Sequence, residues 1–310
     1  MEIISLDKIK GAKNLVLTIG CFDGLHLGHQ KIIREVIAEA KKKKGTSAIL
    51  TFNRHPRSVT KNIRVPFLMT PKEKFNLLAQ WGINLCILAE FNRSFANLSA
   101  QTFCKEILKK RLGVKEVIVS SAFRFGKERI GDVNLLRKLG KKINFSVKAI
   151  KPLEIKDKVV SSSIIRNFVK EAKFKEVKTF LGRDFSVLGK VIPGEKRGRV
   201  LGYPTANLKI DYALNLPLGV HLVMVKIDEK LYNGLANFGF RPTFNAFNKF
   251  PTVEVHLFNF SEDLYHQEIT LIFKKKIRDE IDFSGDKIAL SKQIKKDEAK
   301  AKKILTRKES

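Results

Sequence analysis

Residues 18–30 read TIGCFDGLHLGHQ, a stretch rich in glycine and histidine that follows the apolar segment LVLTIG (15–20). The apolar segment is typical of a strand, and residues 29–44 carry apolar side chains at helical spacing, among them Ile33, Val36, Ile37 and Ala40. The pattern therefore predicts a strand, a tight turn and a helix in that order. Glycines let a turn come close to a ligand, and the start of a helix presents free N–H groups and a positive dipole end. We interpret the turn as an anion site for phosphate.

The two histidines of this stretch strengthen the phosphate interpretation. His26 and His29 are three residues apart, so they project from the same side of the first helical turn. Imidazole can donate hydrogen bonds to phosphate oxygens or stabilise developing charge near neutral pH. A purely structural role is the alternative, and two histidines without a third ligand give only weak support for zinc. The glycines and Asp23 favour phosphate.

Composition limits the class of protein. The chain has 310 residues, of which 44% are hydrophobic and 29% charged, and this suits two globular domains better than one. The N-terminus lacks the pattern of a signal peptide and no apolar run is long enough to span a bilayer, so we expect a cytosolic protein without a membrane partner. Three widely spaced cysteines, Cys21, Cys86 and Cys104, lie in apolar segments, and we expect them to be reduced core residues.

The net charge of +29 raises the question of nucleic-acid binding. The lysines are spread over many segments, whereas a nucleic-acid reader concentrates its charge and interleaves aromatic residues for stacking. We therefore expect attraction to polyphosphates and weak, salt-sensitive binding to nucleic acid, without a specific nucleic-acid partner. A basic nucleic-acid-binding protein remains the remote alternative.

Up to about residue 160, short apolar strands alternate with helical patterns. Strands are expected at 15–20, 47–52, 84–91, 115–123 and 145–150, and helices at 29–44, 71–81, 99–112 (with Ser99 as N-cap) and 132–140. This alternation predicts a doubly wound parallel sheet, whose ligands gather at the carboxyl ends of the strands. TIGCFDGLHLGH (18–29), TFNRHP (51–56) and SSAFRFG (120–126) all follow predicted strands. We expect the three to converge on one cleft.

The pattern of the sequence changes near residue 182, from helical spacing to alternating strands. SSSIIRNFVKEAKFKEVKTFLG (161–182) is typical of one or two helices, and after it alternating strands and Gly/Pro turns dominate. The second half predicts an antiparallel β-barrel followed by a terminal helix from about Ser284 to Lys303. We place the boundary between an N-terminal domain of residues 1–181 and a C-terminal domain of residues 182–310.

Several motifs resemble one family along nearly the whole chain. They are GCFDGLHLGHQ (20–30), SSSIIR (161–166), LGRDFSVLGKV (181–191), GRVLGYPTANL (198–208), NFGFRPTFN (237–245) and the segment 253–280 that begins VEVHL. Together they resemble the prokaryotic bifunctional riboflavin kinase/FMN adenylyltransferases, also called FAD synthetases. The resemblance implies two transferase reactions: ATP phosphorylates riboflavin to FMN in the C-terminal domain, and a second ATP adenylylates FMN to FAD in the N-terminal domain, with release of pyrophosphate. It also implies Mg²⁺ as the cofactor.

In the C-terminal domain the resemblance implies a kinase site around GYPTANL. Gly202 and Pro204 would shape a turn at the nucleotide, while Thr205 and Asn207 would bind ATP and supply hard oxygen ligands to Mg²⁺. Glu254 resembles the catalytic glutamate of the family. Strand alternation places it on the face opposite Val253 and Val255, where a solvated carboxylate is the alternative.

In the N-terminal domain the resemblance implies adenylyl transfer without a covalent intermediate. His26, His29 and Arg166 would align and stabilise the phosphates. The expected nucleotide-binding residues come from the two motifs of this domain: Gly20, Phe22, Asp23, Gly24, Gly28, Ser162 and Ser163. Both serines could also cap the helix that carries Arg166.

A few positions depart from the family pattern. Ala122 and Asn53–Arg54 stand where polar or differently charged residues are usual, Ala172–Lys173 replaces a Gly-Asp pair, and His266 replaces a glycine that would be needed only in a turn of positive φ. Most of these lie on the adenylyltransferase side. The sequence therefore keeps open a riboflavin kinase whose N-terminal domain has lost adenylyl transfer.

Overall fold

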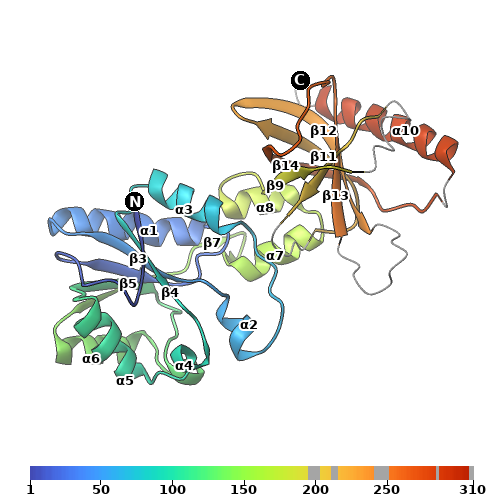
Figure 1. Cartoon of the computed structure of the whole chain (residues 1–310). Helices are drawn as coiled ribbons and strands as arrows, with labels where there is room; N and C mark the ends of the chain where they lie inside the picture. Colours follow the sequence, from blue (N-terminus) through green and yellow to red (C-terminus); the bar gives the residue numbers. More distant parts are fainter. Residues whose placement is uncertain (195–202, 211–215, 241–250, 284–285, 307–310) are drawn as a thin grey trace. The chain divides into compact units, whose positions relative to one another are not determined.

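The chain folds into two compact units, Met1–Ser162 and Ser163–Ser310, in a computed structural model that describes residues 1–194, 203–210, 216–240, 251–283 and 286–306 (Figure 1). The division lies before the two helices that precede the barrel. The functional boundary between residues 181 and 182 stays a prediction, and each unit is considered by itself.

The first unit is built on a six-stranded sheet in which all paired strands are parallel, as the alternation of strands and helices predicted. The strand order is β1-β4-β3-β2-β5-β6. Its strands are β1 (Glu2–Ser5), β2 (Val16–Ile19), β3 (Ser47–Phe52), β4 (Leu85–Ala89), β5 (Glu116–Ser120) and β6 (Ser146–Ile150), and a separate small hairpin joins β7 (Glu154–Ile155) to β8 (Lys158–Val159). Strand β1 was not predicted, because a segment of four residues is too short to show a clear periodicity.

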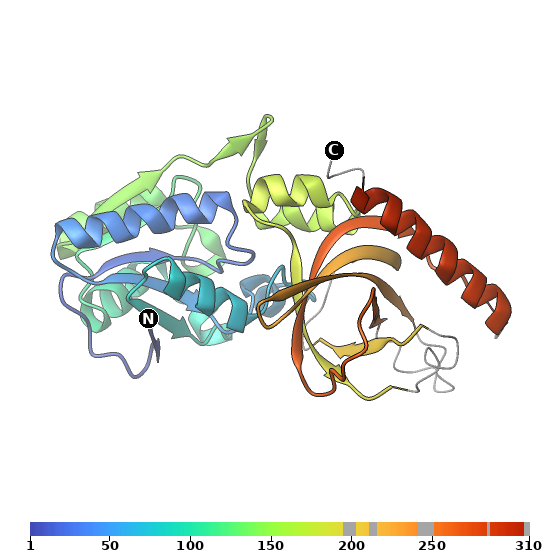
Figure 2. The ribbon, with the colours of Figure 1, turned by 90° about the horizontal axis from the view of Figure 1, so that it is seen from above.

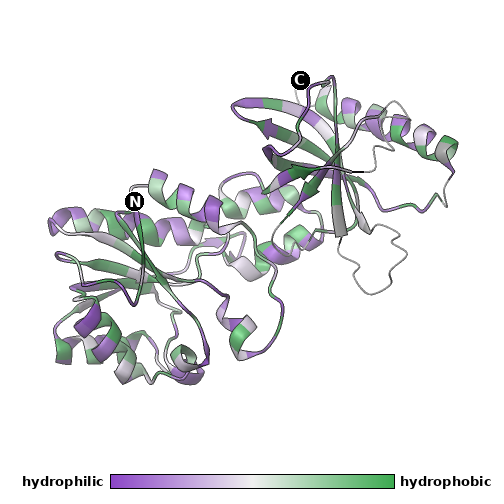
Figure 3. Ribbon diagram, viewed as in Figure 1, coloured by the Kyte–Doolittle hydropathy of each residue, from purple (hydrophilic) through white to green (hydrophobic). Residues whose placement is uncertain are grey.

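Helices cover both faces of this sheet (Figures 1 and 3). On one face lie α1 (Leu27–Lys42) and α3 (Pro71–Gln80), and on the other lie η1 (Phe103–Arg111) and α6 (Val133–Ile143). The shorter helices are α2 (Pro56–Thr60), α4 (Arg93–Ala96), α5 (Ala100–Thr102) and η2 (Lys127–Arg129). Ser99 caps α5 by accepting a hydrogen bond from the Thr102 N–H at 3.0 Å, as predicted. Most of the predicted helix 99–112 is wound as the π-helix η1, which sequence periodicity does not distinguish from an α-helix.

The winding of the chain determines where ligands bind. From β2 the chain adds β3 and then β4 on one side, while β5 and β6 follow on the other side, so β2 and β5 meet at the switch point. Ligands of such sheets bind outside the carboxyl ends of the strands at this point. The segments after β2, β3 and β5 leave three neighbouring strands at that edge, as the sequence predicted.

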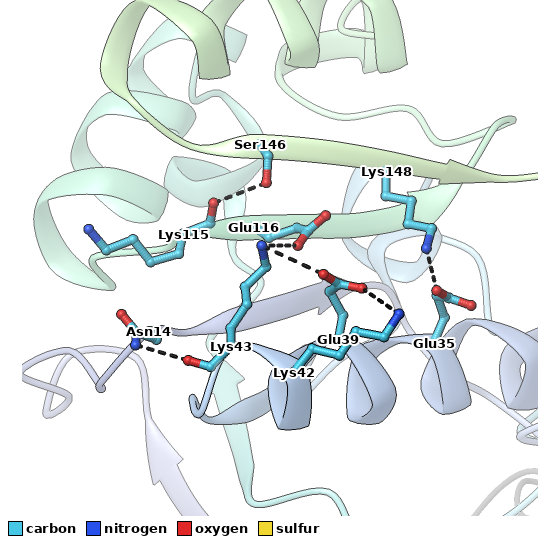
Figure 4. Close-up of polar contacts among 9 residues, drawn as sticks. All are labelled: Asn14, Glu35, Glu39, Lys42, Lys43, Lys115, Glu116, Ser146 and Lys148. Atoms are coloured by element: carbon cyan, nitrogen blue, oxygen red, sulfur yellow. Dashed lines mark hydrogen bonds and ion pairs between the residues drawn. The ribbon is translucent and has the colours of Figure 1, made fainter.

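Ion pairs connect the C-terminal part of α1 to the sheet (Figure 4). Lys43 Nζ lies 3.2 Å from the carboxylate of Glu116, which is 7% exposed at the start of β5, and 3.6 Å from Glu39. The hydrogen bond to Glu116 raises the pKa of Lys43. Further along α1, Glu35 pairs with Lys148 of β6. These contacts fix the helix whose opposite end carries the histidines.

The second unit contains a closed barrel of strand order β10-β13-β12-β11-β14-β9, and all its pairings are antiparallel, as predicted. The strands are β9 (Ser186–Ile192), β10 (Ala206–Lys209), β11 (Gly219–Ile227), β12 (Lys230–Phe240), β13 (Pro251–Leu257) and β14 (Glu268–Arg278). The terminal helix α10 (Lys287–Thr306) packs on the outside of the barrel, where Ala301 contacts a cluster that includes Leu222 and Leu235 (Figure 2). The predicted helix start at Ser284 lies outside the described residues.

Two helices precede the barrel in the second unit. They are α7 (Ser162–Lys170) and α8 (Phe174–Leu181), and they confirm the helical prediction for this segment. Phe174 of α8 packs against the rings of Phe185, His221 and Phe273 of the barrel. Among the described residues, no helix combines the length and hydropathy needed to cross a membrane.

The cysteines agree with the sequence prediction at two of three positions. Cys86 and Cys104 are fully buried thiols, and burial raises their pKa values to about 11 and about 12. Cys21 is only half-buried, so a core position was wrong for this residue. It lies beyond the last residue of β2, in the connection to α1.

Two departures from the family pattern lie at left-handed backbone positions. Ala172 has a φ of 53° and His266 a φ of 67°. Lys173 is the N-cap residue of α8 and makes no side-chain capping bond there, but its ammonium pairs with Glu171 at 2.6 Å. At these positions the chain therefore lacks the relaxed turn that glycine gives and the cap that aspartate gives.

We expect His266→Gly to stabilise the protein. Left-handed backbone costs a non-glycine residue roughly 1–2 kcal/mol, and the greater freedom of glycine in the unfolded chain offsets about 0.4–1 kcal/mol of the gain. The free energy of unfolding, measured by urea denaturation followed by circular dichroism, should rise by about 0.5–1 kcal/mol. His266→Ala is the control and should bring no comparable gain, because alanine keeps the strain. Equal stabilisation by both substitutions would contradict this account.

We also expect the buried His221 to make stability fall in acid. The side chain is fully buried, its Nε2 lies 2.9 Å from the Pro217 carbonyl oxygen, and burial lowers its pKa from 6.5 to about 4. Between these values the unfolded chain binds a proton that the folded chain does not, so the free energy of unfolding decreases as pH falls from 6.5 to 4. The shift corresponds to about 3 kcal/mol.

The check is urea denaturation at several pH values for the native chain and for His221→Gln. The native chain should lose about 3 kcal/mol more than the variant over this interval. Parallel pH dependence of the two proteins would show that His221 does not titrate with the shifted pKa.

Candidate functional site

The connection from β2 to α1 has an unusual backbone. Phe22, Gly24 and Leu25 have φ values of 50°, 79° and 43°. Non-glycine residues in this region cost of order 1 kcal/mol each and persist only where the surroundings hold them. Gly20 begins the connection: its N–H donates to the Leu50 carbonyl oxygen at 3.0 Å, and a Cβ there would lie 3.3 Å from the Phe22 ring.

The two histidines close this connection at the start of α1. His26 is the N-cap residue, and its Nδ1 accepts a hydrogen bond from the His29 N–H at 3.2 Å. The imidazole rings stack with their centroids 3.6 Å apart and an interplanar angle of 17°. Gly28 permits this packing, since a Cβ at that position would lie 3.2 Å from the His26 ring. The helix begins at Leu27, two residues before the predicted start.

His29 is a neutral imidazole at physiological pH. Burial lowers its pKa well below 6.5, and the neighbouring His26 and Lys74 act in the same direction. Its Nδ1 is buried and makes no hydrogen bond within the described part of the chain. His29 can therefore act on a phosphate through a directed N–H hydrogen bond rather than through a full positive charge.

Asp23 and Ser162, two predicted nucleotide-binding residues, hold the connection in place. Asp23 is 5% exposed, and its Oδ1 accepts a hydrogen bond from the Leu68 N–H at 2.9 Å. The Ser162 hydroxyl donates to the backbone carbonyl oxygen of Asp23, also at 2.9 Å. The sequence predicted nucleotide binding for both residues, which stays a prediction, and the structure adds that both make contacts within the first unit.

Sequence reasoning missed Lys74. This residue lies on α3 and its Nζ donates to the Thr51 hydroxyl at 3.2 Å and to the Cys21 carbonyl oxygen at 3.4 Å. In the sequence it is one lysine of PKEKF, two residues after the exposed Lys72, and lysine side chains are seldom buried. Only the packing of α3 shows which of them is buried.

The remaining predicted residues of the adenylyl-transfer motifs lie in the second unit. Ser163 and Arg166 are part of α7, and Arg166 is 9% exposed. Their cooperation with the histidines stays a prediction. Of the departures, Asn53 accepts a hydrogen bond from the Phe91 N–H at 3.0 Å, and Ala122 is exposed in the turn after β5.

The barrel brings the predicted kinase residues together through its register. Asn207 of β10 is directly opposite Glu254 of β13, and Asn237 of β12 is opposite Glu254 on the other side. Opposed residues project from the same face of a sheet, so the three side chains form one polar row. Val253 and Val255 are 2% and 0% exposed in the barrel interior, which confirms that Glu254 faces the other way.

The residues before β10 are held against strand β13. His256 Nδ1 lies 2.9 Å from the Pro204 carbonyl oxygen, and its ring packs edge-on against Tyr203. Thr205 is exposed next to the buried Asn207, while the predicted Gly202 lies outside the described residues. Gly194 was not singled out from the sequence, yet a Cβ there would overlap the Asn207 amide.

The barrel residues offer oxygen donors to a cation. The Thr205 hydroxyl, the Asn207 amide oxygen and the Glu254 carboxylate are hard ligands of the kind that small divalent cations prefer. Among the described residues, barrel included, no group of three or more His, Cys, Asp or Glu side chains is close enough to hold a metal ion. Metal binding by Thr205 and Asn207 stays a prediction.

Comparisons with known proteins identify each half of the chain. The family model for FAD synthetase matches residues 8–164, and the one for riboflavin kinase matches residues 181–305. A solved structure from Streptococcus pneumoniae, named a macrolide-efflux protein, is similar with a TM-score of 0.85 and 28% identity over 97% of this chain and 98% of its own. Its name refers to a different process, and the fold is what the two proteins share.

Curated relatives cover nearly the whole chain and carry one name, bifunctional riboflavin kinase/FMN adenylyltransferase. The relative from Buchnera aphidicola (subspecies Schizaphis graminum) is 39% identical over 95% of both chains, and the one from Escherichia coli K12 is 33% identical over 96% of this chain and 97% of its own. A Bacillus subtilis relative is 35% identical over 92% of this chain and 91% of its own. With the two domain models in this order and relatives of this coverage, the chain belongs to the bifunctional riboflavin kinase/FMN adenylyltransferase family.

Proposed function

We propose that this protein phosphorylates riboflavin to FMN and then adenylylates FMN to FAD, with ATP as the co-substrate of both steps. One observation carries the proposal: two separately matched domains occur in order in one chain, and relatives of the same length carry the name of both activities. The polar row of the barrel and the stacked histidines of the first unit support it. The cytoplasmic location stays a prediction.

In the kinase step, the 5′-hydroxyl of riboflavin attacks the γ-phosphorus of ATP and the bond to the β-phosphate oxygen breaks, which releases ADP. Glu254 accepts the hydroxyl proton. Its place on the outer face of β13, opposite Asn207, allows the carboxylate to meet a substrate rather than the barrel core. Thr205 and Asn207 bind the nucleotide next to it, and Pro204 directly precedes Thr205. The nucleotide-binding role of Gly202 is a prediction from the motif resemblance.

We assign Mg²⁺ to the same donors. Mg²⁺ keeps several waters and is bound by a few protein oxygens together with substrate phosphates, which suits a set made of Thr205 and Asn207 beside a carboxylate. When bound, the ion neutralises phosphate charge in the kinase step.

In the adenylyl step, a phosphate oxygen of FMN attacks the α-phosphorus of ATP and the bond to pyrophosphate breaks. No covalent enzyme intermediate is needed, so alignment and charge stabilisation provide the catalysis. His29 donates an N–H hydrogen bond to phosphate, His26 orients it by stacking, and the first N–H groups of α1 face the same anion. Gly20, Phe22, Asp23, Gly24 and Gly28 shape the nucleotide turn. The motif resemblance predicts nucleotide-binding roles for Ser162 and Ser163 and a phosphate-binding role for Arg166.

A riboflavin kinase without adenylyl transfer is the second candidate, and Ala122 is the observation that favours it. This position, after β5 at the switch-point edge, lacks a polar side chain. Of the other departures, Asn53 accepts a hydrogen bond from the backbone N–H of Phe91, and Ala172 and Lys173 lie in the turn between α7 and α8. Neither the fold nor the relatives favour a nucleic-acid-binding function.

The decisive experiment separates flavins by chromatography after incubation with ATP and Mg²⁺. One reaction starts from riboflavin and the other from FMN. FAD in both reactions would establish both activities, whereas FMN that accumulates without FAD would establish the kinase alone. If neither flavin is converted under saturating ATP, the proposal is wrong.

We expect His29→Ala to abolish FAD formation selectively. Loss of a directed hydrogen bond to the reacting phosphates should lower the rate from FMN by about 10²-fold or more. The rate of FMN formation from riboflavin is the internal control and should stay within about twofold, because the kinase residues lie in the other unit. Equal loss of both rates would point to misfolding.

Glu254→Gln should have the opposite selectivity. Without a carboxylate to accept the proton, FMN formation should slow by about 10²–10⁴-fold while adenylylation of supplied FMN continues. Glu229→Gln is the matched control, because Glu229 is 93% exposed in its side chain and pairs with the nearby Lys226 at 3.2 Å in the β11–β12 hairpin. A kinase rate that survives Glu254→Gln would remove Glu254 from the catalytic role.

A further inference from the structure

Helix α3 buries a lysine amine in the first unit. Lys74 is 9% exposed, although it lies on a helix whose Lys72 is exposed. Burial of an ammonium group costs several kcal/mol unless partners compensate, so a buried lysine calls for a specific role. Burial lowers the pKa of Lys74, while Cys86, Cys21 and Asp23 act in the opposite direction.

The contacts of Lys74 converge on the backbone of the connection from β2 to α1. Its Nζ donates to the Cys21 carbonyl oxygen at 3.4 Å and to the Thr51 hydroxyl at 3.2 Å, and that hydroxyl donates to the same carbonyl oxygen at 3.2 Å. Two donors therefore hold one carbonyl group. Cys21 directly precedes Phe22, the first left-handed residue of the connection.

Helix α3 is itself well anchored for this task. Pro71 begins the helix, and Thr70 and Glu73 form a reciprocal capping box, with the Thr70 N–H donating to Glu73 at 2.8 Å. Just before the helix, the Leu68 N–H donates to Asp23. The segment 68–74 thus holds the connection at two points, one on each side of Phe22.

We propose that Lys74 is a positioning residue for adenylyl transfer, which fixes the Cys21 carbonyl and thereby keeps His26 and His29 aligned for the phosphates. This inference rests on the proposed function of the first unit. A purely structural lysine would stabilise the fold without altering the histidines. A positioning role and a purely structural role therefore predict different values for kcat of FAD formation and for the pKa of His29.

The charge of Lys74 also acts on His29. It adds to burial and to His26 in keeping the His29 imidazole neutral. The titratable groups around the pair are Cys21, Asp23 and His26 of the connection and Cys86 of β4. Removal of the ammonium should therefore raise the pKa of His29, and the acid limb of the pH profile of FAD formation should move to higher pH.

The test compares Lys74→Met with Lys72→Met, the same chemical change at an exposed position of the same helix. With FMN and ATP as substrates, we expect Lys74→Met to lower kcat by about 10- to 100-fold, as misplacement of reacting groups does, while Lys72→Met stays near the native rate. The melting temperature and circular dichroism spectrum of each variant report whether the first unit is folded, and the kinase rate is the internal control for the second unit. Thr51→Val, which removes one of the two donors, should give a smaller loss in the same direction, and Lys74→Arg should recover part of the rate.

A second readout does not depend on activity. Titration of the His29 ring, followed by NMR, should show a higher pKa in Lys74→Met than in Lys72→Met. If Lys74→Met matches Lys72→Met in kcat and in the His29 titration and only the melting temperature falls, Lys74 is structural and the inference is wrong. If the native chain forms no FAD, the proposed function fails instead, and an unchanged His29 titration would overturn the inference separately.

Discussion

The first unit depends on a left-handed backbone between β2 and α1. Phe22, Gly24 and Leu25 all have positive φ, and this conformation turns the chain sharply enough for α1 to begin directly outside the central strands. Such a turn persists only because its surroundings hold it. The groups that do so come from distant parts of the sequence: Thr51 of β3, Leu68 and Lys74 around the start of α3, and Ser162 at the start of α7. The stacked histidines are a consequence of this restrained turn.

The second unit depends on strand register instead. Asn207, Glu254 and Asn237 belong to three strands, and only the antiparallel pairing of β10, β13 and β12 makes them neighbours. A slip of one residue would turn Glu254 into the barrel and expose Val253 or Val255. The burial of these two valines therefore secures the position of the carboxylate, so the apolar core and the polar row are two results of one register.

The departures from the family pattern have different physical meanings in the structure. Ala172, Lys173 and His266 concern turns and a helix start, where they affect backbone strain and capping. Asn53 satisfies a backbone N–H. Ala122 alone removes a polar side chain from the edge of the sheet at which ligands of this fold bind. A departure from the family pattern therefore bears on function only where the fold places that residue at the ligand-binding edge of the sheet.

The sequence by itself determined the two architectures, the order of the domains and the motifs that carry the chemistry. It did so because strand and helix periodicity, glycine-rich turns and the alternation around Glu254 are local properties of the chain. Tertiary structure alone decided that Cys21 leaves the core, that Asn237 joins Glu254, and that Lys74 rather than Lys72 is buried against the connection from β2 to α1. Each of these depends on which distant segments meet, and a one-dimensional pattern records the type of a side chain but not the neighbours that packing gives it.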